Sequence, residues 1–184
     1  SAADETADSE ATEEEPAESA EAETYAAEIV GAAKSDKIDY TVEKDGTITI
    51  NTVKTSKTKF KIPEKIDEKT VAAIGGGAFA YQKSIKTVTI PSTVKSIGDN
   101  AFNGCTKLSK ITIPKSVTEI GQGAFTDTPW LKAKEKANAM VIINNVLYSG
   151  KNAKGNITIP ASVDTITSNA FSSNKKITGI NIPK

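Results

Sequence analysis

Short triplets of alternating apolar and polar residues recur along the chain, and each one ends at a proline. Four of them share an aliphatic, polar, aliphatic pattern. In a β-strand this alternation places the two aliphatic side chains on one face and the polar side chain on the other. The following proline has no N–H to donate and a fixed φ, so it ends the strand. The pattern predicts four short strands, at Val88–Ile90, Ile111–Ile113, Ile157–Ile159 and Ile180–Ile182.

The prolines set a period of 23 residues. Five Ile-Pro pairs have their prolines 28, 23, 46 and 23 residues apart, so one unit carries 5 extra residues and another carries 23. Between the prolines, valine, isoleucine, glycine, an Ala-Phe pair and leucine return at fixed offsets. One unit is too small to bury a core of its own, but stacked units share one. We therefore expect a solenoid with one column of phenylalanines: Phe79, Phe102, Phe125 and Phe171.

The full pattern is I-P-x-x-V-x-x-I-G-x-x-A-F-x-x-C-x-x-L-x-x-I-x-I-P, present whole in residues 90–114. It resembles the BspA-type leucine-rich repeat of bacterial surface proteins, over about residues 60–184. The resemblance implies an α/β-type repeat solenoid with a parallel β-sheet and short helical or irregular segments on its other face. It also implies a noncatalytic protein that is secreted, or attached to the cell surface as a lipoprotein or by a wall anchor. Some proteins of this family are adhesins for host matrix proteins.

Three segments depart from the regular unit. Residues 38–50 alternate around Asp45-Gly46, which predicts a β-hairpin, so we assign residues 34–61 to an N-terminal β cap and 62–184 to the solenoid. The 23 extra residues predict an inserted helix and a hairpin at about residues 127–150. At the other end, either the protein continues beyond Lys184 or the last predicted strand leaves an edge open for edge-to-edge association through the C-terminal repeat.

Two single residues allow more than one interpretation. Cys105, the only cysteine, is either a packing thiol or a nucleophile, and its place at the family's cysteine position favours packing. Trp130, the only tryptophan, either packs in the core or offers its ring to a sugar. Similar Thr-Pro-Trp-Leu stretches in the family favour core packing. Thr167 stands where the other units have glycine, which marks that unit as irregular.

The charges are segregated along the chain. Residues 1–33 hold 11 acidic residues and no lysine, whereas residues 34–184 hold 23 lysines and 12 acidic residues. We interpret residues 1–33 as an acidic spacer, with a short helix favoured at residues 23–31. An alternative is that this segment folds back on the lysine-rich body as an electrostatic latch, although salt screens exposed charges beyond about 8–10 Å.

The composition excludes several kinds of chemistry. The chain has no histidine and no arginine, so it holds no Ser-His-Asp triad, no His-ligated zinc and no guanidinium contact to a base. Gly75–Gly77 lacks the Gly-Lys-Ser/Thr of a phosphate loop. Scattered lysines without interleaved aromatic residues do not indicate nucleic-acid binding, and no transmembrane segment is present. The composition still allows a Ser-Lys dyad or a pair of catalytic carboxylates, but no residue is singled out for either. We expect no catalytic residue, no metal and no cofactor.

A regular polar face remains as the candidate site. The middle residues of the strands should form an outward column flanked by lysines, although threonine is also simply a good strand former. Such a face offers a rigid surface to a macromolecular partner, a protein or glycan of the host or of a cell surface. The alternative is a passive structural spacer that carries another domain. The candidate binding residues are Thr89, Thr112, Thr158, Asn181, Lys86 and Lys110.

Overall fold

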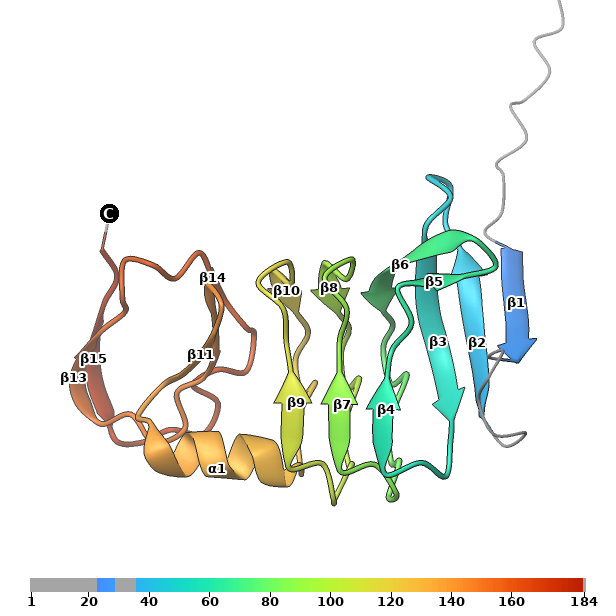
Figure 1. The fold of residues 1–184 in the computed structure, drawn as a ribbon. Helices are drawn as coiled ribbons and strands as arrows, with labels where there is room; N and C mark the ends of the chain where they lie inside the picture. The colour runs from blue at the N-terminus through green and yellow to red at the C-terminus, as the bar shows by residue number, and fades with distance from the viewer. Residues whose placement is uncertain (1–22, 29–35, 184) are drawn as a thin grey trace, which may run out of the picture.

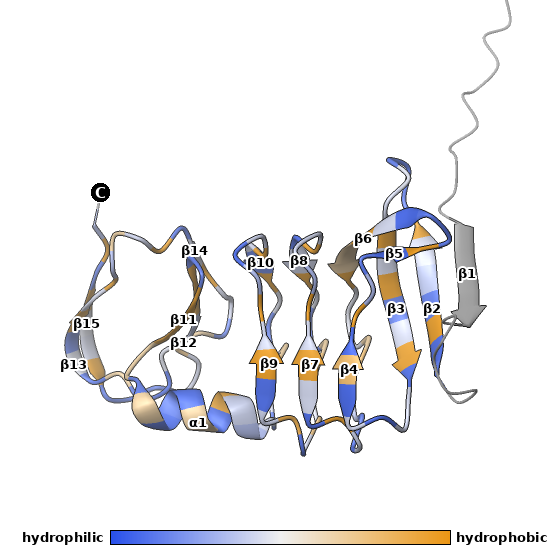
Figure 2. Cartoon of the chain, viewed as in Figure 1, coloured by the Kyte–Doolittle hydropathy of each residue, from blue (hydrophilic) through white to orange (hydrophobic). Residues whose placement is uncertain are grey.

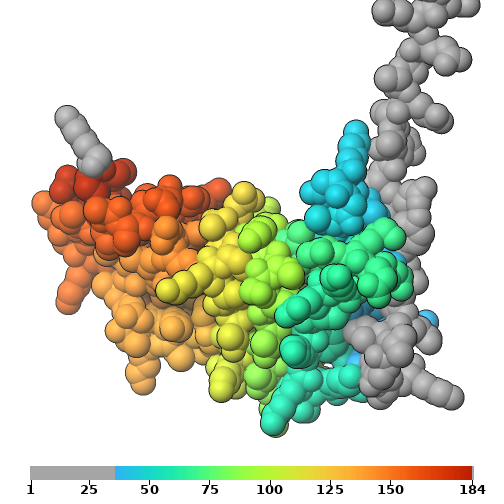
Figure 3. All heavy atoms as spheres, turned by 45° about the horizontal axis from the view of Figure 1, so that its top comes forward, coloured from blue at the N-terminus to red at the C-terminus, as the bar shows by residue number. Residues whose placement is uncertain are grey.

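The protein is an elongated stack of short strands in this computed structural model, which describes residues 23–28 and 36–183 (Figure 1). Successive turns lie side by side in the order of the sequence (Figure 3). The elements are β1 (Glu23–Glu28), β2 (Lys37–Val42), β3 (Ile48–Lys54), β4 (Lys59–Lys61), β5 (Lys65–Ile66), β6 (Lys69–Ile74), β7 (Thr87–Thr89), β8 (Ser96–Ile97), β9 (Lys110–Thr112), β10 (Glu119–Ile120), α1 (Pro129–Ala137), β11 (Val141–Ile143), β12 (Val146–Ser149), β13 (Gly155–Thr158), β14 (Thr165–Ile166) and β15 (Ile177–Asn181).

The N-terminal cap contains the predicted hairpin. Strands β2 and β3 pair antiparallel, and the side chain of Asp45 accepts a hydrogen bond from the Thr47 N–H in the turn between them. Strand β3 also pairs with β6 in parallel, so the cap is continuous with the solenoid sheet. The expected boundary at residues 61 and 62 differs from the structure, because β4 already pairs with β7 of the repeat ladder.

The short helix favoured at residues 23–31 is wrong for the residues that the structure describes. Residues Glu23–Glu28 form β1, which pairs antiparallel with β2 along its whole length. The free edge of β2 presents backbone N–H and C=O groups, and pairing with them outweighs a weak local preference for helix. The rest of the expected acidic spacer, residues 1–22 and 29–33, lies outside the described residues.

Two parallel ladders run along the solenoid. One contains β4, β7 and β9, and the other contains β3, β6, β8 and β10. Partners in the regular ladder are 23 residues apart, as in Val88 opposite Ile111 and Ile97 opposite Ile120. The predicted period therefore equals one full turn. Figure 2 shows the alternation on β4, β7 and β9, where a hydrophobic band separates more polar strand ends.

A file of aromatic rings fills the space between the ladders. The ring centroids of Phe79 and Phe102 lie 4.9 Å apart, and those of Phe102 and Phe125 lie 5.7 Å apart, with the planes nearly parallel. All three side chains are fully buried. Phe60 extends the file towards the cap with an edge-on contact of 5.5 Å to Phe79. The file is the centre of the main core.

The predicted place of Phe171 in this file is wrong. The ring beside Phe125 on the C-terminal side is that of Tyr148, with centroids 5.3 Å apart. Phe171 is half-buried and packs on a separate smaller core that contains Leu147, Ile159 and Ala170. Because Tyr148 comes 23 residues after Phe125, the extra residues form a turn of altered form that displaces Phe171 from the file.

The altered turn contains the predicted helix and hairpin. Helix α1 begins with Pro129, and the Thr128 hydroxyl caps it by accepting from the Leu131 N–H at 3.1 Å. Strands β11 and β12 pair antiparallel around Asn144, whose φ of 52° an asparagine tolerates. Where the earlier turns have a strand of the β4–β7–β9 ladder, this turn has α1 (Figure 1). Strands β13 and β15 form a separate pair, and β14 pairs with β12.

Candidate binding face

The outward side of β4, β7 and β9 carries a patch of lysines and threonines. In each of these strands the central residue, Phe60, Val88 or Ile111, is buried, and the residues on either side of it face solvent. Parallel pairing fixes the spacing between the strands. We call this patch the lysine–threonine face and define it by Lys59, Lys61, Lys86, Thr87, Thr89, Lys110 and Thr112.

The structure brings together only part of the predicted column. Thr89 lies directly opposite Thr112, and Lys110 lies opposite Thr87. Thr158 lies opposite Asn181, but that pair belongs to the separate ladder of β13 and β15. The four residues do not form one column, because helix α1 replaces the strand that would have joined the two ladders.

The sequence did not predict three members of the face, which are Lys59, Lys61 and Thr87. Lys59 and Lys61 lie on β4, opposite Thr87 and Thr89. A signal for them was present, since Phe60-Lys61-Ile62 is followed by Pro63 and has the same alternating pattern as the four predicted strands. This strand was not predicted because Phe60 stands where the other triplets have valine or isoleucine.

The face is positively charged. Lys59, Lys61, Lys86 and Lys110 are all exposed, and none of the seven residues that define the face is acidic. Lys57, just before β4, is paired with the buried carboxylate of Asp36 at 2.6 Å, so its charge is already balanced. An acidic surface on a partner would complement this face.

Cys105 lies inside the solenoid. Its side chain is fully buried, and its thiol donates a hydrogen bond to the carbonyl oxygen of Phe79, with a sulfur–oxygen distance of 3.0 Å. Burial raises the pKa of this thiol to about 11. The expectation of a packing thiol is confirmed by this burial.

We expect Cys105 to react slowly with a thiol reagent at pH 8. With a pKa of about 11, roughly one thiol in a thousand is ionised there, and the thiolate is the reactive form. Native protein should be modified at least about 100-fold more slowly than protein unfolded in guanidinium, where the pKa returns to about 8.5. The two rates can be followed by absorbance with a chromogenic disulfide, and equal rates would contradict the buried position.

Trp130 packs against the end of the aromatic file. Its ring is half-buried and lies 4.8 Å from that of Phe125, so the interpretation as a core residue is confirmed. The ammonium of Lys134 sits 5.8 Å from the centroid of the same ring. Trp130 therefore contacts both the aromatic file and a lysine of its own helix.

The part of the chain that the structure describes has neither a cluster of metal ligands nor a membrane-spanning helix. Residues 23–28 and 36–183 hold no group of three or more Cys, Asp or Glu side chains that could bind a metal ion. In the same ranges no helix has the length and apolar character needed to cross a membrane.

Solved structures of bacterial leucine-rich repeat proteins are similar to this chain. One from T. pallidum is 26% identical, with a TM-score of 0.56, over 78% of this chain and 67% of that protein. One from Bacteroides ovatus is 27% identical, with a TM-score of 0.50, over 79% of this chain and 40% of that protein. A leucine-rich cell surface protein from Faecalibacterium prausnitzii is 24% identical, with a TM-score of 0.53, over 83% and 42%. This chain thus spans less than half of the last two proteins.

The sequence itself carries the family pattern. A comparison of this chain with curated protein sequences gives no match. The family model of the BspA-type leucine-rich repeat region matches residues 72–184, in six copies. That range is more than half of the chain and includes the altered turn, α1 and Tyr148. The chain belongs to the BspA-type leucine-rich repeat family.

Proposed function

We propose that this chain is a noncatalytic binding module that holds an acidic partner protein on its lysine–threonine face. The observation that carries the proposal is a set of seven basic and hydroxyl residues on or next to three paired strands, with all four lysines exposed and no acidic residue among the seven. We further propose that the module acts outside the cell, secreted or attached by a lipid or wall anchor, with host matrix proteins among its partners. The proposed location is supported by membership of the BspA-type family.

The rigidity of the face favours binding. Each strand of the face is fixed by its neighbours and by a buried residue at its centre, so little backbone order remains to be gained when a partner docks. The lysine side chains would speed the encounter with an acidic surface and make binding depend on salt. The threonine hydroxyls, which lie between the lysines, would form short-range hydrogen bonds with the partner.

The C-terminal end supports a second kind of contact. Strand β15 pairs with β13, and Ile180 and Ile182 at this end are 46% and 64% exposed. Edge-to-edge association through this repeat stays a prediction, since aliphatic side chains beside a strand edge favour pairing with another chain.

The experiment is a binding assay with two charge-matched variants. Intact protein is immobilised and exposed to purified host matrix proteins and mucin at physiological salt. The face variant carries Lys61→Glu, Lys86→Glu and Lys110→Glu, and the control carries Lys95→Glu, Lys154→Glu and Lys175→Glu. Both change the net charge equally, so non-specific attraction falls equally in both.

We expect the face variant to bind at least about tenfold more weakly than the intact protein, and the control to bind nearly as well. Binding of the intact protein should weaken as salt is raised. If both triple variants lose the same affinity, the face has no special role. If the intact protein captures nothing from the panel, the passive spacer is the better interpretation.

A further inference from the structure

The loops at one edge of the solenoid are joined by a backbone ladder of their own. The Gly77 N–H donates to the carbonyl of Asp99 at 2.9 Å, and the Asn100 N–H donates to that of Gln122 at 2.9 Å. A second row runs beside it, from the Tyr81 N–H to the Asn103 carbonyl at 2.8 Å and onward by the same step. Each loop therefore donates to the loop 23 residues later.

This ladder stops at the altered turn. The next donors in the two rows are Gly123 and Asp127, and neither N–H makes a hydrogen bond to any residue that the structure describes. Between these rows, the Phe125 N–H finds the hydroxyl of Tyr148 at 2.9 Å, where the regular turns use a backbone carbonyl. The reason is that residues 146–149 form strand β12 and not a loop.

A cavity of about 250 Å³ lies where the missing loop would have been. Its walls come from the loop at residues 123–126, from helix α1, from β12 and from the loop at residues 169–174. The Asn169 amide donates to the Gln122 side chain at 3.0 Å and so links the two loops across the altered turn. The cavity is smaller than the roughly 300 Å³ of the smallest drug-sized pockets, so it suits one small ring.

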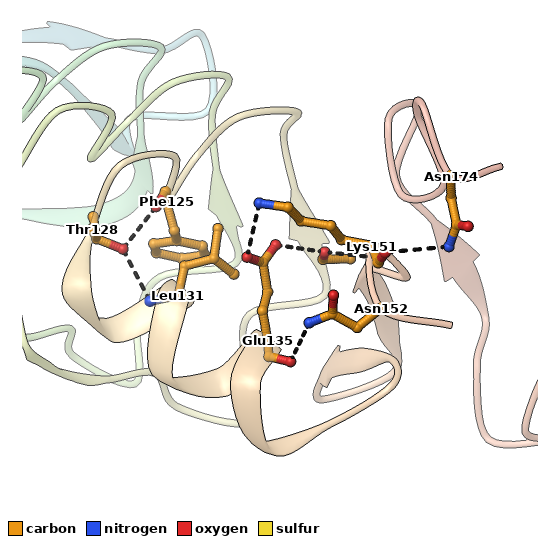
Figure 4. Close-up of polar contacts among 8 residues, drawn as sticks. Phe125, Thr128, Leu131, Glu135, Lys151, Asn152 and Asn174 are labelled. Atoms are coloured by element: carbon orange, nitrogen blue, oxygen red, sulfur yellow. Dashed lines mark hydrogen bonds and ion pairs between the residues drawn. The ribbon is translucent and has the colours of Figure 1, made fainter. Parts of the chain in front are cut away.

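A carboxylate is fixed on the helix side of this cavity. The side chain of Glu135 is 13% exposed, accepts a hydrogen bond from the Ser149 hydroxyl at 2.8 Å and lies 3.6 Å from the ammonium of Lys151 (Figure 4). The Asn152 amide donates to the backbone carbonyl of Glu135 at 2.6 Å, which holds the helix end in place. These contacts set the direction of the carboxylate before any ligand arrives.

The remaining walls offer hydroxyl and apolar groups. The side chains of Thr126 and Ser172 line the cavity from its two loops. Leu131 and the ring of Tyr148, both nearly buried, form apolar parts of the lining. The cavity thus combines the backbone N–H of Gly123, hydroxyls, a fixed carboxylate and a small apolar surface.

We infer that this cavity binds one neutral hexose unit of a glycan. Sugar hydroxyls both donate and accept, so they match the carboxylate of Glu135 and the N–H of Gly123 at once. The C–H groups of the ring would lie on Leu131. A phosphate or another anion fits poorly, because the one lysine in the lining, Lys151, is already beside a carboxylate. The inference goes beyond the proposed function, since it uses no residue of the lysine–threonine face.

The test is a titration of the ¹⁵N-labelled full chain with methyl glucoside, methyl galactoside, methyl mannoside and N-acetylglucosamine, each up to about 50 mM. For at least one of these sugars we expect saturable amide shifts centred on Gly123, Thr126 and Ser149, which line the cavity, with a millimolar dissociation constant. Glu135→Gln should weaken that binding about tenfold, because a hydrogen bond to a charged acceptor is lost. Absence of shifts at these amides with all four sugars would overturn the inference.

A pair of variants separates the cavity from the rest of the surface. Ser172→Leu places a larger side chain in the cavity and should abolish the shifts. Asn103→Leu makes a comparable change at the position that corresponds to Thr126 and Ser172 in a regular loop, and should leave binding intact. The amide spectrum of each variant reports whether it is folded. Equal affinity in the wild-type protein and a folded Ser172→Leu variant would place the sugar elsewhere and reject the site.

Discussion

Replacing Phe102 by alanine is expected to lower the free energy of unfolding by about 3–5 kcal/mol. Phe102 is fully buried and sits between the rings of Phe79 and Phe125, at 4.9 and 5.7 Å. Backbone ladders fix the spacing of the turns, so the neighbours cannot close the space that the ring leaves. The variant loses both the burial of the ring and the contacts of its two partners. Urea denaturation of both proteins measures the difference.

Phe171→Ala is the matched control for this experiment. The two residues occupy the same position in the sequence repeat, but Phe171 is half-buried and lies outside the aromatic file. We expect its loss to be less than half that of Phe102→Ala. Equal losses would mean that the file is not the main source of stability, and would contradict the arrangement described here.

Gly98→Ala should cost about 3 kcal/mol although it adds only one methyl group. A Cβ atom at residue 98 would lie 2.6 Å from the backbone nitrogen of Gly76 and 2.8 Å from the carbonyl carbon of Gly75. These are main-chain atoms of the preceding turn, so relief requires the turns to separate. The Gly98 N–H also donates to the Ile74 carbonyl at 2.7 Å, and separation would weaken that bond. The same denaturation assay measures the effect.

Gly76→Ala provides the control. A Cβ atom there would have only the Asp99 carbonyl oxygen near it, at 3.4 Å. The equivalent positions in the next two turns are Asp99 and Gln122, so side chains are accepted at this point of the unit. We expect a change of less than about 1 kcal/mol. A Gly98→Ala variant as stable as Gly76→Ala would show that the turns are more loosely stacked than the structure indicates.

The crowding at the position of Gly98 also explains why Thr167 can stand at the equivalent position of a later unit. In the regular turns the glycine faces the backbone of the preceding loop, which leaves no room for a side chain. In the turn that precedes Thr167 the chain runs as strand β12, and the Thr167 hydroxyl donates to the Tyr148 carbonyl at 2.9 Å. Threonine is accepted there because the preceding turn has a different form.

The regular turns could be predicted almost entirely from the sequence. The 23-residue period fixed which residues pair, and the alternation before each proline fixed which side chains are buried, as Val88 opposite Ile111 shows. Local signals also located the cap hairpin and helix α1. Repeats allow this because each turn contacts only its neighbours, so a local pattern is also a spatial one.

The altered turn could not be predicted in the same way. Its 23 extra residues predicted an inserted helix and hairpin, but these residues do not follow the repeat pattern, so their place in the stack was not predicted. Tyr148, and not Phe171, follows Phe125 in the aromatic file because the hairpin of β11 and β12 places the Tyr148 ring beside that of Phe125. The cavity beside Glu135 depends on the same choice, because it occupies the place of the loop that the hairpin removes.

The sequence by itself determined the family, the stacking of the turns and the polar character of the outward strand positions, since these follow from a pattern that repeats at a fixed interval. Only the tertiary structure decided that β1 is a strand, that the lysine–threonine face ends at β9, and that a polar cavity opens beyond Phe125. These features arise where one segment meets a partner distant in the sequence. The free energy that stabilises these features comes from pairing and packing between segments distant in the sequence, so a local sequence pattern does not predict them.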